Sequence, residues 1–156
     1  MSFPPPLSRR RLIQSGGAGL AMIAGLPAEA AEIYTRALSS LGAGGYDVVA
    51  YFSSGAPVVG SPGFSHRWKG ATWRFSSAAN RDAFALAPER YAPAYGGHCA
   101  WAASQGYRAA GDPRQWRIVE GRLFFNYDAD VHRRWQNNIA DFIAAGDRHW
   151  PALAAQ

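Results

Sequence analysis

Two segments that each turn at a glycine restrict the fold of this chain more than any other feature. Residues 64–75 alternate apolar and polar side chains on both sides of Lys69-Gly70. Residues 116–126 carry apolar and aromatic runs on both sides of Glu120-Gly121. A residue–glycine pair between two such runs is typical of a tight turn that joins antiparallel strands. We therefore expect two β-hairpins, and we find no internal repeat in the sequence.

Helical signals occur between and after the hairpins. We expect helices over the ranges 78–86, 88–91, 98–105 and 129–149. Asp128 is placed to cap the start of the last helix, and Pro151 is expected to end it. This helix carries one apolar stripe at helical spacing, formed by Val131, Trp135, Ile139 and Phe142. The expected fold is α+β: two β-hairpins interleaved with short helices, followed by a C-terminal amphipathic helix.

The segment before the first hairpin divides at a run of glycines. Residues 31–45 are expected to form a short helix, or a docking arm, followed by a Gly-rich linker. Residues 46–52 are rich in β-branched and aromatic side chains, which predicts a further strand or extended segment. The sequence thus indicates one domain over residues 46–153, preceded by a short lead-in.

Composition limits how this domain is held together and what it contacts. Aromatic residues make up 13% of the chain and supply large apolar area for a core. The single cysteine excludes an intramolecular disulfide. The net charge is +5, but the arginines are spread along the chain, so we expect no nucleic-acid partner. No run of 18 apolar residues occurs, so no permanent membrane span is expected after signal cleavage.

Residues 1–30 are typical of an export signal. Ser8-Arg9-Arg10 resembles the start of a twin-arginine signal, and residues 16–26 form a short apolar segment after it. Ala28-Glu29-Ala30 places small residues around a cleavage point near Ala30. We expect a periplasmic protein, exported by the twin-arginine route, with the general secretory route as the alternative.

Several blocks of the sequence resemble one known family. Residues 75–91 are similar to the C-terminal half of a YHS domain, whose pattern is Phe-Cys-Ser-x-x-Cys followed by a Pro-Glu-x-Tyr ending. Residues 45–52, 68–73, 95–100 and 123–127 resemble blocks of the exported YHS domain-containing (seleno)protein family. This resemblance implies a YHS-like domain over 46–153, with its YHS core at about 46–95. It implies no defined activity.

The resemblance also implies a metal site, but the residues at its positions differ. YHS domains elsewhere are associated with metal handling, and their paired cysteines are the expected ligands. Here these positions hold Ser76 and Asn80, which cannot supply thiolates for copper or zinc. Ser76-Ser77 can cap the helix that follows, and this is the role expected for Ser76. His66, His98 and Cys99 are the remaining candidate metal ligands, although a histidine such as His66 is more often hydrogen-bonded at the edge of a core.

Cys99 is the candidate catalytic residue. It follows Gly96-Gly97 and stands in the first turn of a predicted helix, where backbone N–H groups should lower its thiol pKa. The resemblance adds that some relatives carry selenocysteine, a residue of redox chemistry. The alternative is a buried and inert cysteine. A cysteine hydrolase would need Cys99 beside a histidine and an orienting group such as Asn126, and nothing in the local sequence supports that pairing.

These observations leave three functions open. The first is a periplasmic module that binds a metal ion, such as copper or zinc, or a small molecule. The second is a thiol-based redox protein that acts through Cys99. The third is a structural or partner-binding domain with a degenerate metal site. The sequence leaves open whether the protein is an enzyme and what its oligomeric state is.

Overall fold

Both predicted hairpins form in the computed structural model, which describes residues 32–156. In the first, β1 (Ser61–Trp68) pairs antiparallel with β2 (Ala71–Phe75). In the second, β3 (Asp112–Val119) pairs antiparallel with β4 (Arg122–Asn126). Among the described residues the two hairpins do not hydrogen-bond to each other, so each is a separate two-stranded sheet.

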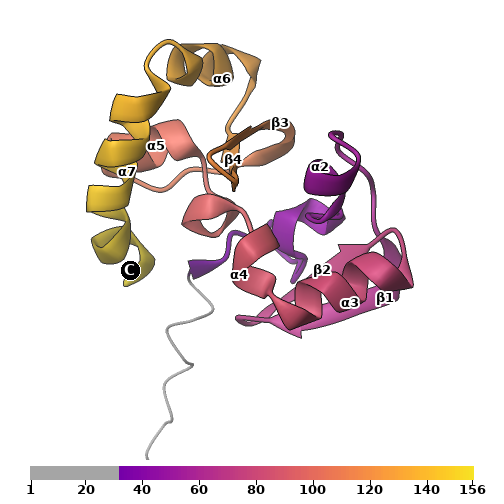
Figure 1. Ribbon diagram of the computed structural model, residues 1–156. Coiled ribbons are helices and arrows are strands. Elements are labelled where there is room, and N and C mark those ends of the chain that lie inside the picture. Colours follow the sequence, from indigo (N-terminus) through magenta and orange to yellow (C-terminus); the bar gives the residue numbers. More distant parts are fainter. Residues whose placement is uncertain (1–31) are drawn as a thin grey trace, which may run out of the picture.

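Short helices surround the hairpins, and the longest helix ends the chain (Figure 1). The helical elements are η1 (Gly42–Gly45), α2 (Ala50–Ser53), α3 (Ala78–Leu86), α4 (Pro88–Tyr91), η2 (Ala94–Gly97), α5 (Ala100–Ser104), α6 (Ala129–Gln136) and α7 (Ile139–Ala154). Together with the hairpins they make the predicted α+β fold. No helix within residues 32–156 has the length and apolar character needed to cross a membrane. The export signal predicted for residues 1–30 lies outside the described range.

The predicted strand over residues 46–52 is wrong, because this segment turns into α2. Only its first residue pairs, as a single bridge. The carboxylate of Asp47 accepts hydrogen bonds from backbone N–H groups at the start of α2, which stabilises a helical turn over an extended chain. Residues 33–41 form an arm instead of a helix, and the glycines after them form η1.

The predicted last helix is divided into α6 and α7. Asp128 caps α6 as predicted, because its side chain accepts the N–H of Val131 at 2.8 Å. Asn138 then leaves helical geometry, with φ −153° and ψ 61°, and α7 begins at the next residue. The prediction that Pro151 ends the helix is wrong, since α7 continues through the proline to Ala154.

The chain contains the same succession of elements twice. An N-terminal unit (residues 42–86) and a C-terminal unit (residues 94–136) each run from a 3-10 turn through a short helix and a hairpin to a capped helix. Both hairpins pair a strand of eight residues with one of five, and both shift register near the start of the longer strand. The sequence itself shows no repeat, so this correspondence is one of structure alone.

Backbone dihedrals show how closely the two units correspond. Their opening turns each place three consecutive residues in the left-handed region, with φ of 49°, 60° and 86° at residues 43–45 and 56°, 60° and 86° at residues 95–97. The hairpin turns repeat the same geometry, with φ of 46° and 73° at Lys69-Gly70 and 49° and 75° at Glu120-Gly121. These positions pair residues of the two units, with one residue more in the N-terminal unit between its opening turn and its hairpin turn.

Strand β4 lies between two apolar clusters. Leu123 and Phe125 pack into a cluster that includes Trp73, Phe75 and other residues of the N-terminal unit. The intervening Phe124 packs into a second cluster formed with the C-terminal helices. Successive side chains of a strand point to opposite faces, so one strand contributes to both clusters. In Figure 1 the second hairpin accordingly stands between β1–β2 and the helices α5–α7.

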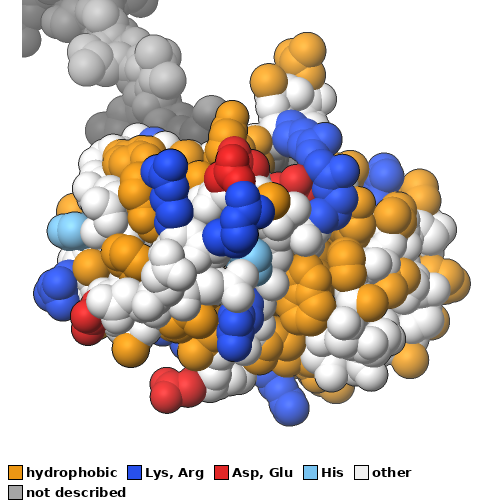
Figure 2. All heavy atoms as spheres, turned by 90° about the horizontal axis from the view of Figure 1, so that it is seen from above, with side chains coloured by type: hydrophobic (Ala, Val, Ile, Leu, Met, Phe, Trp, Pro, Cys, Tyr) orange, Lys and Arg blue, Asp and Glu red, His pale blue; other side chains and the backbone are white. Residues whose placement is uncertain are grey.

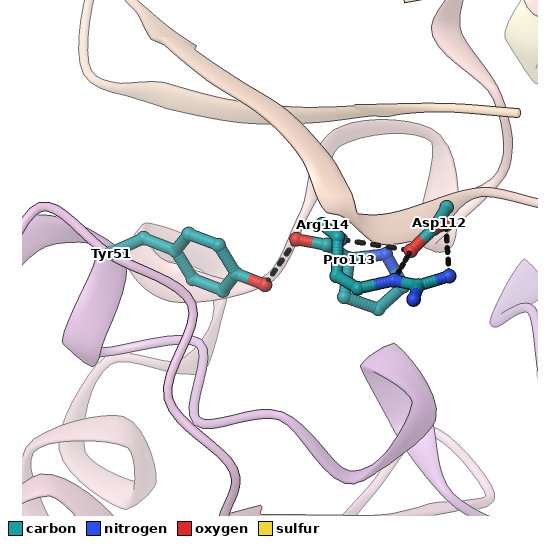
Figure 3. Close-up of polar contacts among 4 residues, drawn as sticks. All are labelled: Tyr51, Asp112, Pro113 and Arg114. Atoms are coloured by element: carbon teal, nitrogen blue, oxygen red, sulfur yellow. Dashed lines mark hydrogen bonds and ion pairs between the residues drawn. The ribbon is translucent and has the colours of Figure 1, made fainter. Parts of the chain in front are cut away.

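A buried tyrosine adds a polar link between the two units. The hydroxyl of Tyr51, in α2, donates a hydrogen bond to the carbonyl oxygen of Pro113, in β3, at 2.7 Å (Figure 3). Burial raises the pKa of Tyr51, so its hydroxyl stays protonated and remains a donor. On the neighbouring residues, Asp112 accepts from Arg114. The units are thus joined by a directed contact as well as by the shared strand.

Candidate functional site

A buried carboxylate organises the N-terminal unit. The side chain of Asp47 is fully buried. Its Oδ1 accepts from the N–H groups of Val49 (2.9 Å) and Ala50 (3.2 Å). Its Oδ2 accepts from the N–H (2.8 Å) and Oγ (2.6 Å) of Ser76 and from Nδ2 of Asn80 (2.8 Å). We call these residues the Asp47 cluster.

The Asp47 cluster corrects the role predicted for Ser76. The cap of α3 is the neighbouring Ser77, whose Oγ accepts the N–H of Asn80 at 3.1 Å. Ser76 and Asn80, at the two positions where the resemblance implies metal ligands, do come together, but as donors to a carboxylate. A hydroxyl and an amide committed in this way do not fit copper or a structural zinc ion. The cluster is a closed hydrogen-bonded site.

The alternative metal ligands do not come together either. His66 lies on the inner face of β1, as predicted, with its ring edge-on to that of Phe84 at a centroid distance of 6.0 Å. Within residues 32–156 no group of three or more His, Cys, Asp or Glu side chains is placed to hold a metal ion. His66, His98 and Cys99 therefore do not form a ligand set.

His98 is held in a fixed orientation within the C-terminal unit, between η2 and α5. It is 7% exposed, and its Nδ1 donates to the carbonyl oxygen of Tyr95 at 2.9 Å. The rings of Tyr34 and Trp150 each lie 5.4 Å from the His98 ring. Burial lowers the pKa of His98, and the charge of Arg108 adds to the effect, so the imidazole is neutral at pH 7. It supplies no positive charge to the adjacent thiol.

Cys99 caps the short helix α5 and is almost completely buried, with 1% of its surface exposed. Its Sγ accepts the N–H of Ala102 at 3.5 Å, and its thiol donates toward Oδ1 of Asn126 at 3.7 Å. Backbone N–H groups of Ala102, Tyr127 and Trp101 favour the thiolate, but burial raises the pKa of Cys99 by more than they lower it. The predicted low pKa is therefore wrong, because burial outweighs the helix N-terminus.

An apolar cavity of about 190 Å³ opens beside Cys99. The thiol forms part of its wall, and the rings of Trp101, Tyr107 and Tyr127 and the side chain of Val131 form most of the rest. We call this space the Cys99 cavity. None of the residues around it carries a charge at neutral pH, so it suits an uncharged occupant.

Asn126 connects the thiol to a histidine that the sequence did not single out. Its fully buried side chain accepts the N–H of Trp101 at 3.2 Å and donates from Nδ2 to Nδ1 of His132 at 3.1 Å. Burial, together with Arg117, lowers the pKa of His132. Because the amide stands between thiol and imidazole, His132 does not take a proton directly from Cys99. The arrangement of a cysteine hydrolase is therefore not formed here.

A second, more polar cavity of about 300 Å³ lies where the two hairpin turns meet the start of the described chain. Its cations are largely paired, Lys69 with Glu32 at 2.9 Å and Arg122 with Asp147 at 2.9 Å. Figure 2 shows the molecule from above. On this face the basic side chains are separated by other groups and do not form one patch. The Cys99 cavity is the better-defined candidate site.

A scan against models of protein families, a search of curated proteins and a search of solved structures found no match to this chain. The similarity to exported YHS domain-containing proteins therefore stays a prediction from the sequence.

Proposed function

We propose that this protein is an exported binding module that holds a small uncharged molecule in the Cys99 cavity. The observation that carries the proposal is the cavity itself, about 190 Å³ of apolar space walled by three aromatic rings and a thiol. Burial of apolar ligand surface contributes about 25 cal/mol for each Å² removed from water, and the lost freedom of the ligand offsets part of this gain. The cavity therefore suits weak, reversible binding of a small molecule.

Binding without a chemical reaction agrees best with the residues that line the Cys99 cavity. Nucleophilic chemistry at Cys99 needs a thiolate, and burial favours the neutral thiol. The nearest imidazole, His132, is separated from the sulfur by the Asn126 amide. Three backbone N–H groups directed at the sulfur are the one observation that favours a thiol redox protein, which is the second candidate.

The cavity can be tested by filling it. We expect a panel of neutral fragments, aliphatic and aromatic, to shift amide resonances of residues around the Cys99 cavity in NMR spectra of the purified protein. Val131→Phe should weaken this binding at least tenfold, because the larger ring occupies the cavity. Val59→Phe is the matched control, since Val59 is 69% exposed and remote in the N-terminal unit. A panel with no bound fragment, or binding unchanged by Val131→Phe, would leave a structural or partner-binding role instead.

Export belongs to the same proposal, and it can be tested separately. Replacing Arg9 and Arg10 together by lysine should trap an uncleaved precursor in the cytoplasm, because the twin-arginine pattern requires both arginines. Arg11→Lys, at the variable position of the pattern, should be exported normally. Cell fractionation and sequencing of the mature N-terminus, expected at Ala31, give the result. Normal export of the double variant would assign the general secretory route.

A further inference from the structure

Cys99 occupies the place in the C-terminal unit that Asp47 occupies in the N-terminal unit. Both residues stand two positions after the left-handed turn, and each accepts the N–H three residues on with its side chain, Ala50 at 3.2 Å and Ala102 at 3.5 Å. The backbone hydrogen bonds match as well. The N–H of Asp47 donates to the carbonyl oxygen of Val58 at 2.8 Å, and the N–H of Cys99 donates to the carbonyl oxygen of Ala109 at 2.9 Å. A buried acceptor thus begins the short helix in both units.

The residues that close the Asp47 cluster have counterparts at the Cys99 cavity. The caps Ser77 and Asp128 align α3 with α6, which places Tyr127 opposite Ser76 and Val131 opposite Asn80. The Ser76 hydroxyl and Asn80 amide fill the space over Asp47 with hydrogen bonds. Tyr127 contributes only its backbone N–H to the sulfur, and the side chain of Val131 has no polar atom to contribute.

The cavity lies at these positions of the C-terminal unit. Tyr127 and Val131 both border it, as do Cys99 itself and Trp101 and Ala102 of the short helix. The same positions in the N-terminal unit belong to the Asp47 cluster, where they are closed by the chain's own side chains. The C-terminal unit therefore presents the same site in an open form.

We infer that the Cys99 cavity, which lies at the positions corresponding to the Asp47 cluster, binds a neutral aromatic molecule of one ring or two fused rings. This inference rests on the proposed function and names its ligand class. An apolar protein cavity of about 150 Å³ holds benzene, so about 190 Å³ accepts a ring of the size of phenol or slightly larger.

The wall of the cavity selects for rings and against charge. Trp101 and Tyr107 meet edge to face at 6.4 Å, which offers a ring both an aromatic face and an aromatic edge. No cation or anion borders the cavity, so a carboxylate or ammonium group on the ligand would be buried without a partner. Phenol should therefore bind at least tenfold more tightly than benzoate, which has a similar ring but carries a charge.

The correspondence between Val131 and Asn80 can be tested with a variant of its own. Val131→Asn places the closing side chain of the N-terminal unit at the corresponding position and should weaken phenol binding at least tenfold in a titration followed by NMR. Val131→Thr, which has nearly the shape of valine and adds only a short hydroxyl, should bind within about threefold of wild type. Val131 is only half-buried, so both variants are expected to fold, and their amide spectra check this.

The possible results separate this inference from the proposed function. If neutral aliphatic fragments occupy the cavity while phenol and indole do not, or if benzoate binds as well as phenol, the ligand class is wrong and the binding function stands. If Val131→Asn binds phenol like wild type while Val131→Phe does not, the relation to the Asp47 cluster is wrong. If no neutral molecule binds, both proposals fail.

Discussion

Asp47→Ala is expected to remove most of the stability of the domain. The substitution removes the acceptor of five hydrogen bonds, and of these donors only the N–H of Ala50 keeps another acceptor, the carbonyl oxygen of residue 47. A hydrogen bond to a charged group contributes about 1.5–3 kcal/mol, so the four bonds that are lost outright amount to about 5 kcal/mol or more. Small domains have only about 5–15 kcal/mol in total. Urea denaturation followed by circular dichroism should show a large fall in the midpoint, or no folded baseline.

Matched variants identify the cause of that loss. Asp82→Ala removes a carboxylate from the exposed face of α3, where its partner is the adjacent Arg81, and should change the unfolding free energy by less than about 0.5 kcal/mol. Ser76→Ala and Asn80→Ala each remove one donor side chain and should fall between the two. If Asp47→Ala were as stable as Asp82→Ala, the carboxylate would not organise the N-terminal unit.

Cys99 is expected to resist alkylation in the native protein at pH 7. The thiol is 1% exposed, and burial raises its pKa, so the thiolate that reacts with iodoacetamide is scarce. Labelling measured by mass spectrometry should be at least about 100-fold slower than in the urea-unfolded protein, where the thiol has its ordinary pKa near 8.5. The native rate should rise with pH, because the raised pKa moves thiolate formation to more alkaline conditions.

Rapid native labelling at pH 7 would reverse this conclusion. It would mean that the three backbone N–H groups around Sγ outweigh burial, and it would favour the thiol redox function over the binding function. Cys99→Ser, which keeps a small polar side chain at the helix cap, is the control that assigns any label to this residue. The wild-type protein pre-incubated with phenol tests whether an occupied cavity protects the thiol further.

The parts of the fold that the sequence predicts correctly are those fixed by neighbouring residues. A glycine turn brings its two strands together whatever surrounds them, and the cap residue Asp128 acts within one turn of its own helix. Asp47 behaves differently. It lies in a run that reads as a strand, and the side chains that bind it are 29 and 33 residues away. No local pattern indicates that partnership.

Only the part of the candidate site that depends on neighbouring residues could be predicted from the sequence. The single cysteine and the glycines before it identify Cys99, and the effect of the short helix on its sulfur is local. Its burial depends on distant packing, including a bridge to Phe125, and that burial sets the direction of its pKa. The structural repeat is not visible in the sequence because corresponding residues differ in chemistry. The carboxylate of Asp47 corresponds to the thiol of Cys99, and the amide of Asn80 corresponds to the side chain of Val131.

The strand shared by the two apolar clusters has a consequence for how the chain loses its structure. Leu123 and Phe125 complete the core of one unit while Phe124 completes that of the other, so neither unit keeps its interior if β4 detaches. The halves repeat one architecture but should unfold as a single cooperative body, and slow amide exchange should reach its maximum together on both sides of β4. A molecule seated beside Cys99 would then slow exchange even around Asp47, although it contacts nothing there.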